Sequence, residues 1–239
     1  MLNRFLKPEV RTARYHARIE RWSRPIEGPV SRAKAWAHMM FADHGALRLV
    51  YLNHHQVSHK LWRSAQPAPQ QIAAFAAAGV RTVVYLRGGR AHGAWPLERE
   101  ACERHGVGLV QFVMRSSEAP SRETILAAKE FFANLEYPAV AHCKSGADRA
   151  GFFAALYILM EGGTADEALT QLSIRYGHNR YARTGILDAF IERYRDHGEA
   201  KGIPFLDWVE HHYDAEALVR DFKPDFWSDL LFTRILRRE

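Results

Sequence analysis

Apolar residues form two kinds of pattern along the middle of the chain. Short runs rich in β-branched residues are typical of buried strands, and longer segments with apolar positions three and four residues apart are typical of helices that cover a core. Because the two patterns alternate, we expect an α/β fold with a mainly parallel central sheet and helices on both faces. The predicted strands are residues 58–67, 81–86, 109–113 and 138–142, and the predicted helices between them are residues 69–78, 97–105 and 122–135.

After these strands the pattern becomes helical. A helix over residues 149–160 is apolar on nearly every side, which predicts that it lies at the centre of the core. Thr164 and Glu167 form the pair that is typical of a capping box at the start of the next helix. Further helices are predicted over residues 186–196, 205–213 and 226–236. The last one is short and amphipathic, and we expect it to pack on the domain, with a partner or a membrane as the alternative.

Charge separates the first 36 residues from the rest. They hold nine Lys or Arg residues against three Glu, so they carry the whole formal charge of +6 of this 239-residue chain. Tyr15, Ile19 and Trp22 share one face of a predicted helix. We expect this basic arm either to dock on the domain or to meet an anionic membrane surface or an acidic partner, and we expect no nucleic acid partner. Beyond the arm, residues 31–40 are predicted to be helical and residues 48–52 extended.

Composition and cysteine content limit the class of protein. Hydrophobic residues make up 47% and charged residues 25% of the chain, as in ordinary globular proteins. No apolar run has the length of a transmembrane helix, and the N-terminus lacks the apolar core of a signal peptide. Because Cys102 and Cys143 are the only cysteines, we expect no disulfide framework and predict a cytoplasmic location, either free or peripheral at the membrane. Cys102 lies in a predicted helix, where a small apolar core residue is expected.

The candidate chemistry follows the last predicted strand, in the segment Ala-His-Cys-Lys-Ser-Gly-Ala-Asp-Arg-Ala-Gly at residues 141–151. Five residues separate Cys143 from Arg149, which is enough for one tight loop around a tetrahedral anion. Backbone N–H groups of such a loop and the helix N-terminus attract phosphate oxygens, and Arg149 can donate two hydrogen bonds to them. The same positive field favours the thiolate form of Cys143. Gly146 allows close backbone approach or a positive φ.

Three segments of the chain resemble one family. His142, Cys143 and Arg149 stand in the His-Cys-x5-Arg spacing that is the signature of the cysteine-dependent protein tyrosine phosphatase superfamily. Trp-Arg-Ser-Ala-Gln-Pro at residues 62–67 and Leu-Arg-Gly at residues 86–88 resemble two further segments of the bacterial, fungal and plant atypical dual-specificity phosphatases. The resemblance does not explain the two ends of the chain. We therefore expect a basic N-terminal extension over residues 1–55, a phosphatase catalytic domain over residues 56–185, and a helical C-terminal extension packed on it over residues 186–239.

The resemblance implies a phosphatase that hydrolyses phosphomonoesters through a phosphocysteine intermediate, without a metal or another cofactor. Cys143 would attack phosphorus, and Arg149 with the loop amides would stabilise charge in both transition states. His142 is expected to orient the loop and tune the thiol. Lys144 either favours polyanionic substrates from the rim of the loop or is simply solvated. The residues expected to bind substrate are His142, Lys144, Ser145, Gly146, Ala147, Arg63 and Arg87.

Two carboxyl groups are candidates for the proton donor to the leaving oxygen. Most similar enzymes carry an Asp on a loop after an upstream strand, but residues 114–120 contain none. Asp148 is favoured, because bacterial secreted lipid and tyrosine phosphatases and myotubularin-like lipid phosphatases carry Asp at this loop position, where it is a proposed acid. Glu118 is the alternative acid, in which case Asp148 would form a structural salt bridge within the loop. Four polar residues could form a basic rim or position the hydrolytic water, but a place at the surface explains them equally well, so they are not assigned as catalytic. They are His178, Asn179, Arg180 and Arg183.

Ala150 leaves the efficiency of turnover open. Most similar enzymes place Ser or Thr at this position, where the hydroxyl helps the thiolate leave, so slow breakdown of the intermediate is predicted. A phosphate-binding domain without turnover is therefore the alternative to an enzyme, whereas sulfur transfer on a rhodanese-like loop is disfavoured by the strand–loop–helix arrangement. The expected partner is a phosphorylated protein or a small phosphorylated molecule. A lipid, inositol or glycan phosphate is the alternative substrate.

Overall fold

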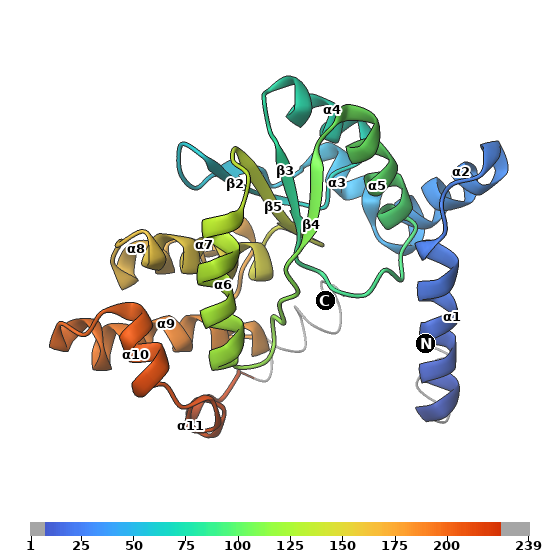
Figure 1. Ribbon diagram of the computed structural model, residues 1–239. Coiled ribbons are helices and arrows are strands. Elements are labelled where there is room, and N and C mark those ends of the chain that lie inside the picture. The colour runs from blue at the N-terminus through green and yellow to red at the C-terminus, as the bar shows by residue number, and fades with distance from the viewer. Residues whose placement is uncertain (1–7, 226–239) are drawn as a thin grey trace.

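A five-stranded sheet forms the centre of the protein (Figure 1). The structure, a computed structural model, describes residues 8–225. The strands are β1 (His55–Gln56), β2 (Leu61–Ala65), β3 (Thr82–Tyr85), β4 (Gly108–Gln111) and β5 (Ala139–Cys143). Their order is β1-β2-β5-β3-β4, in which the edge strand β1 is antiparallel to β2 and all other neighbours are parallel. The predicted α/β class with a mainly parallel sheet is confirmed.

Strand β5 lies between β2 and β3, and all of its residues are buried. A parallel strand covered on both faces takes small or apolar side chains, and His142 is the one polar exception before Cys143. Side chains alternate between the two faces, so Val83 and Val140 pack into one layer while Val84 packs into the other. The carboxyl ends of the parallel strands meet at one edge of the sheet, which places Cys143 where sites of α/β folds usually lie.

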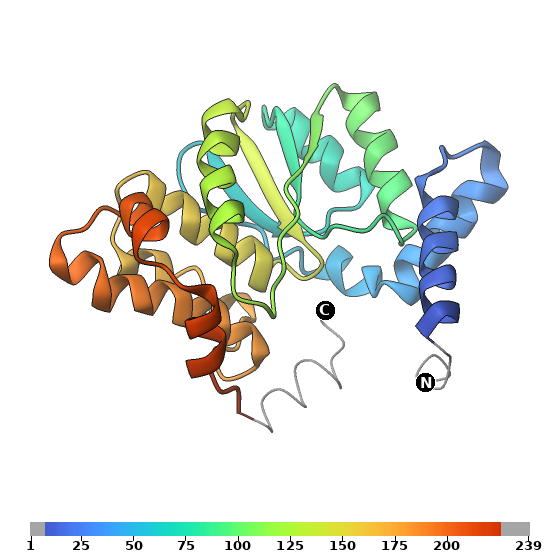
Figure 2. The same ribbon diagram turned by 60° about the horizontal axis from the view of Figure 1, so that its bottom comes forward.

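Helices cover both faces of the sheet, as Figures 1 and 2 show from two directions. The buried helix that follows β5 is apolar all round, as predicted, and its Phe153 packs against Phe132 with ring centroids 4.7 Å apart. One face of the sheet is covered by α4 (Pro69–Ala77) and α5 (Ala94–His105), and the other by α6 (Arg122–Asn134) and α7 (Asp148–Met160).

The helices after α7 extend the same hydrophobic core. Phe190, Trp208 and Tyr213 are buried, and their ring centroids lie 4.9 to 5.7 Å apart. The helix predicted over residues 226–236 lies outside the described residues. Within residues 8–225 no helix is long and apolar enough to span a bilayer. These C-terminal helices are α8 (Ala165–Leu169), α9 (Ile186–His197), α10 (Phe205–His211) and α11 (Ala215–Asp221).

The N-terminal segment folds against the α5 side of the sheet (Figure 1). The Trp22 ring lies 4.7 Å from that of His38, and Arg99 of α5 donates to the Ser23 carbonyl at 3.0 Å. These contacts hold the end of the first helix, whose remaining side chains are largely exposed. The helical elements of this segment are α1 (Pro8–Ser23), α2 (Gly28–Ala37), η2 (His38–Ala42) and α3 (Gly45–Val50).

The prediction of an extended segment over residues 48–52 is wrong, because α3 continues to Val50. The run Arg-Leu-Val-Tyr-Leu has the apolar composition of a strand. However, the Arg48 side chain turns back and donates to the carbonyl and carboxylate oxygens of Asp43 at 2.5 and 2.9 Å. This buried contact stabilises a helical turn that local propensity alone does not favour.

Candidate active site

A tight loop joins the end of β5 to the start of α7. Cys143, the last residue of β5, is 1% exposed, and α7 begins at Asp148. Gly146 has a φ of +75°, and a Cβ at this position would lie 2.6 Å from the backbone nitrogen of Ala65. Only glycine fits here without displacing β2. The loop can therefore lie directly against the ends of the parallel strands.

The guanidinium of Arg63 braces this loop from behind. Its Nη2 donates to the carbonyls of Gly146 and Ala147 at 2.7 and 2.9 Å, and its Nη1 donates to the Gln171 carbonyl. A planar trans peptide points its N–H away from its C=O, so the N–H groups of Ala147 and Asp148 are directed away from Arg63. Because Arg63 is fully buried and engaged with these carbonyls, it shapes the loop. The direct contact with substrate that the sequence predicted is not supported by this position.

Arg87 does not have the side-chain position that the predicted substrate contact requires, because its guanidinium binds Asp43 instead. Its guanidinium donates to both carboxylate oxygens of Asp43 at 2.8 Å and to Oε1 of Gln66. Burial opposes the charge of Asp43, but the hydrogen bonds and charges of Arg87 and Arg48 hold the pKa of Asp43 well below its usual range. The backbone carbonyl of Arg87 accepts a hydrogen bond from Nη1 of Arg149 at 3.2 Å. The N-terminal segment thus fixes the residue against which Arg149 rests.

Arg149 keeps donor capacity for a ligand. Its Nε is buried and has no hydrogen-bond partner among the residues that the structure describes. A buried guanidinium N–H without an acceptor is unfavourable. An oxyanion held beside Cys143 would supply that acceptor, which makes the loop between the two residues a candidate phosphate site.

His142 points away from the loop and into the α5 layer. It is fully buried, and its Nε2 lies 2.5 Å from Oε1 of Glu98, whose Oε2 accepts from Gln66 at 2.7 Å. Gln66 in turn contacts Arg87, so the sequence-predicted His142 and Arg87 belong to one buried network. This position fits the expected orienting role of His142 and excludes direct contact with a substrate. Glu98 was missed because a Glu on a predicted helix is usually solvated.

The sequence placed His178 at the surface or in a basic rim, and the structure shows that this is wrong. It is 1% exposed and follows the short helix η3 (Ile174–Tyr176). Its Nδ1 lies 2.7 Å from Oδ1 of Asp148, and its Nε2 lies 2.5 Å from Oδ2 of Asp188. Burial disfavours the charged ring, but the hydrogen bonds to the two carboxylates outweigh it and raise the pKa of His178 to about 9. The candidate acid therefore has a buried cationic partner.

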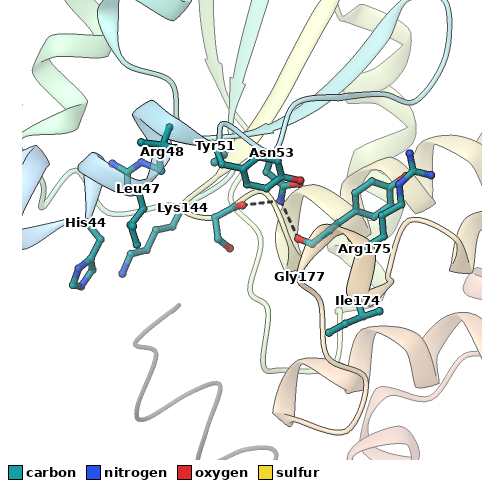
Figure 3. A pocket seen from close by; sticks show the side chains of 13 residues that line it. His44, Leu47, Arg48, Tyr51, Asn53, Lys144, Ile174, Arg175 and Gly177 are labelled. Atoms are coloured by element: carbon teal, nitrogen blue, oxygen red, sulfur yellow. Dashed lines mark hydrogen bonds between the residues drawn. The ribbon is translucent and has the colours of Figure 1, made fainter.

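Lys144 and Ser145, the two residues after Cys143, line a cavity of about 630 Å³ (Figure 3). Asn53 supports its floor by donating to the carbonyls of Ser145 and Tyr176 at 2.9 Å each. The pKa of Lys144 is lowered, mainly by burial. The charge of Asp43 opposes this shift, and the charges of nearby arginines add to it. The exposed apolar side chains that line the cavity are Leu47, Val50, Tyr51 and Ile174, and the basic side chains His44 and Arg175 lie beside them.

Glu118, the alternative acid, lies on the surface. Its Oε1 pairs with Nη1 of Arg115 at 3.0 Å, and its side chain is 60% exposed. Ala150, at the position where most similar enzymes carry Ser or Thr, is fully buried in the first turns of α7. Within residues 8–225 no group of three or more His, Cys, Asp or Glu side chains is arranged to hold a metal ion.

Residues 58–184 match the family described as PTP-SAK, Swiss Army Knife protein, DSP-PTPase phosphatase domain. Among solved structures, the chain is similar to TpbA of P. aeruginosa, with 23% identity, a TM-score of 0.49, and coverage of 65% of this chain and 91% of that one. It is also similar to the core catalytic domain of the PP-IP phosphatase SIW14 from S. cerevisiae, with 20% identity, a TM-score of 0.49, and coverage of 62% and 89%. No curated protein matches the chain.

Proposed function

The chain belongs to the PTP-SAK family of dual-specificity phosphatase domains and is a cysteine-dependent phosphatase; from this premise we propose that Cys143, Arg149 and Asp148 carry its reaction. The observation that supports these roles best is the loop itself. Gly146 packs it against β2, Cys143 stands at its base, and the buried Nε of Arg149 has no acceptor among the described residues. A bound phosphoryl group supplies oxygens for the loop N–H groups and for Arg149.

In the proposed first step, the thiolate of Cys143 attacks phosphorus as the bond to the leaving oxygen breaks. A thiophosphate forms, and Asp148 supplies the proton that the leaving oxygen takes. In the second step, water attacks phosphorus, the S–P bond breaks and a proton returns to Asp148. Arg149 and the loop N–H groups stabilise the phosphoryl oxygens in both transition states. Ala150 provides no hydroxyl to assist the departing thiolate, so we expect the second step to be slow.

Hydrolysis of p-nitrophenyl phosphate by the purified chain tests the assignment. We expect activity that vanadate inhibits, that survives EDTA, and that falls by at least about 10³-fold in Cys143→Ser. Arg149→Lys keeps a charge but loses the planar fork, so it should retain only a small fraction of activity. Cys102→Ser, which removes the other buried thiol, is the matched control. Undiminished hydrolysis by Cys143→Ser would refute the proposal.

The cavity beside Lys144 supports a choice of substrate class. We propose a phosphomonoester whose phosphate is attached to an apolar or aromatic group, such as a phosphotyrosyl peptide, because exposed Leu47, Tyr51 and Ile174 surround the cavity next to Lys144. A parallel screen of phosphotyrosyl and phosphoseryl peptides, phosphoinositides and sugar phosphates separates the alternatives. Leu47→Asp should raise the KM for phosphotyrosyl peptides and leave that for sugar phosphates nearly unchanged. Preference for a sugar phosphate would contradict the apolar class.

The exposed basic face of α1 supports a second proposal, that this helix contacts an anionic membrane surface. Arg14, Arg18 and Arg21 are exposed, whereas Trp22 is half-buried against His38. Cosedimentation with vesicles of phosphatidylserine and phosphatidylcholine should exceed that with phosphatidylcholine alone, and it should decrease with salt. Arg14→Glu with Arg18→Glu should abolish the difference. We place the protein in the cytoplasm, because a reducing compartment keeps the thiol of Cys143 available.

A further inference from the structure

A histidine that the reaction above does not use lies directly behind Asp148. His178 is held between Asp148 Oδ1 and Asp188 Oδ2, at 2.7 and 2.5 Å from its two ring nitrogens. An ionised carboxylate can only accept hydrogen bonds, so a ring between two of them donates from both nitrogens and is an imidazolium. With an exposed fraction of 1%, His178 cannot reach a substrate itself. It can act only through Asp148.

The three groups come from separate elements that pack together at the start of α7. Asp148 is the first residue of α7, Asp188 lies in the first turn of α9, and His178 follows η3. The charged group that faces Asp148 from β2 is Arg63, whose guanidinium also holds the loop carbonyls. We call Asp148, His178 and Asp188 the buried row; its two carboxylates and one imidazolium give it a net charge of −1.

A structural ion pair would need only one of the two acids. The second acid gives the ring a hydrogen-bond partner in either protonation state. When the Nδ1 proton moves to Asp148, the neutral ring keeps its Nε2–H on Asp188. Asp148 is also the only carboxylate between Cys143 and Arg149. The row therefore ends at the one carboxylate of the loop, the group proposed above to give its proton to the leaving oxygen.

We propose that His178, supported by Asp188, stores the proton that Asp148 delivers, and this rests on the function proposed above. The Nδ1 proton of His178 first passes to the ionised carboxylate of Asp148. As Cys143 Sγ bonds to phosphorus and the P–O bond breaks, the leaving oxygen takes this proton from Asp148. When water attacks the thiophosphate and the S–P bond breaks, a proton of that water passes to Asp148 and returns to Nδ1. The ring begins and ends as an imidazolium, and His178 is a positioning residue.

Two esters separate proton delivery from loop structure. Glycerol phosphate has a poor leaving group that needs a proton, whereas p-nitrophenyl phosphate does not. In the full chain, His178→Gln should lower kcat on glycerol phosphate by roughly 100-fold and on p-nitrophenyl phosphate by less than about 5-fold. The wild-type rate on glycerol phosphate should fall as pH rises through about 9, following the pKa of His178. Asp188→Asn should retain activity but move this alkaline limb to lower pH.

The matched control is His197→Gln, at the exposed end of the same helix α9 as Asp188. It should leave both rates and the alkaline limb unchanged. Equal losses on the two esters in His178→Gln, or an unmoved limb in Asp188→Asn, would show that the row only holds α7 and α9 together and would overturn the inference. If His178→Gln does not fold, the position of the limb in Asp188→Asn decides. A wild-type chain without Cys143-dependent hydrolysis of either ester refutes the proposed function itself.

Discussion

Two buried polar networks support the Cys143 loop, and each contains a histidine. On the α5 side, His142 contacts Glu98, which leads through Gln66 to Arg87 and the N-terminal segment. On the α9 side, His178 joins Asp148 to Asp188. The first network ends on a backbone carbonyl that holds Arg149, whereas the second ends on a carboxylate of the loop.

The difference lies in what each network can exchange with a substrate. On the α5 side, Asp43 is matched by Arg48 and Arg87, and its charge is fixed because its pKa lies well below its usual range. Because Asp43 and its two arginines are matched in charge and Arg87 also contacts Gln66, we expect this side to hold the geometry of the loop. On the α9 side, two acids share one titratable ring, so a proton can move without breaking a hydrogen bond. A polar network next to a site can therefore take part in proton transfer only if one of its groups can change its protonation state.

Breaking the α5 side should have the largest effect. Asp43→Ala leaves Arg48 and Arg87 buried without their carboxylate, which should cost about 3–5 kcal/mol of unfolding free energy. Urea unfolding measures this loss. In the protein that remains folded, the rates on both esters should fall together. A loss below about 1 kcal/mol would mean that the N-terminal segment does not support the loop.

On the α9 side, the expected effect is a change of stability with pH. The pKa of His178 is raised to about 9 from its ordinary 6.5, so its stabilising effect is complete below pH 6.5 and disappears as pH rises through about 9. Below pH 6.5, the unfolding free energy of His178→Gln should be lower than that of the wild type by on the order of 3 kcal/mol. Thermal or urea unfolding at a series of pH values measures it. A constant gap would show that the ring is neutral throughout.

A milder change on the α5 side sharpens the contrast. Glu98→Gln preserves shape but weakens the buried contact with His142, at a cost of about 1–3 kcal/mol. Rates on glycerol phosphate and p-nitrophenyl phosphate should decrease by the same factor, and the alkaline limb of the pH profile should not move. A selective loss on glycerol phosphate would place proton transfer on this side instead.

The smallest effect is expected outside both networks. Arg180 pairs with Glu192 at the surface, where its side chain is 54% exposed. Arg180→Ala should change the unfolding free energy by less than about 0.5 kcal/mol and leave both rates unchanged. Together with the buried variants, it sets the scale on which the effects on the two sides are judged. A large effect here would mean that the loop depends on surface charge.

Much of the fold and the candidate loop could be predicted from local pattern. Strand β5, the loop and α7 are continuous in sequence, so small and β-branched residues, Gly146 and the apolar helix specify them nearly without help from elsewhere. Among the described residues, the extended segment predicted at residues 48–52 was wrong, because its helical turn depends on a contact between Arg48 and Asp43. Arg63 and Arg87 were placed near the loop by resemblance, but local pattern could not tell a group that faces substrate from one that faces carbonyls.

The sequence by itself determined the parallel sheet, the place of Cys143 at the carboxyl end of a strand, and the spacing to Arg149, because each follows from neighbours along the chain. Only the tertiary structure decided which polar residues lose their water. Glu98 reaches His142 across 44 residues, and His178 meets Asp148 across 30. A carboxylate on a predicted helix is the same in sequence whether it is solvated or buried. Its protonation and its partner arise only when the helix docks, because burial removes water and leaves another side chain to supply the hydrogen bond.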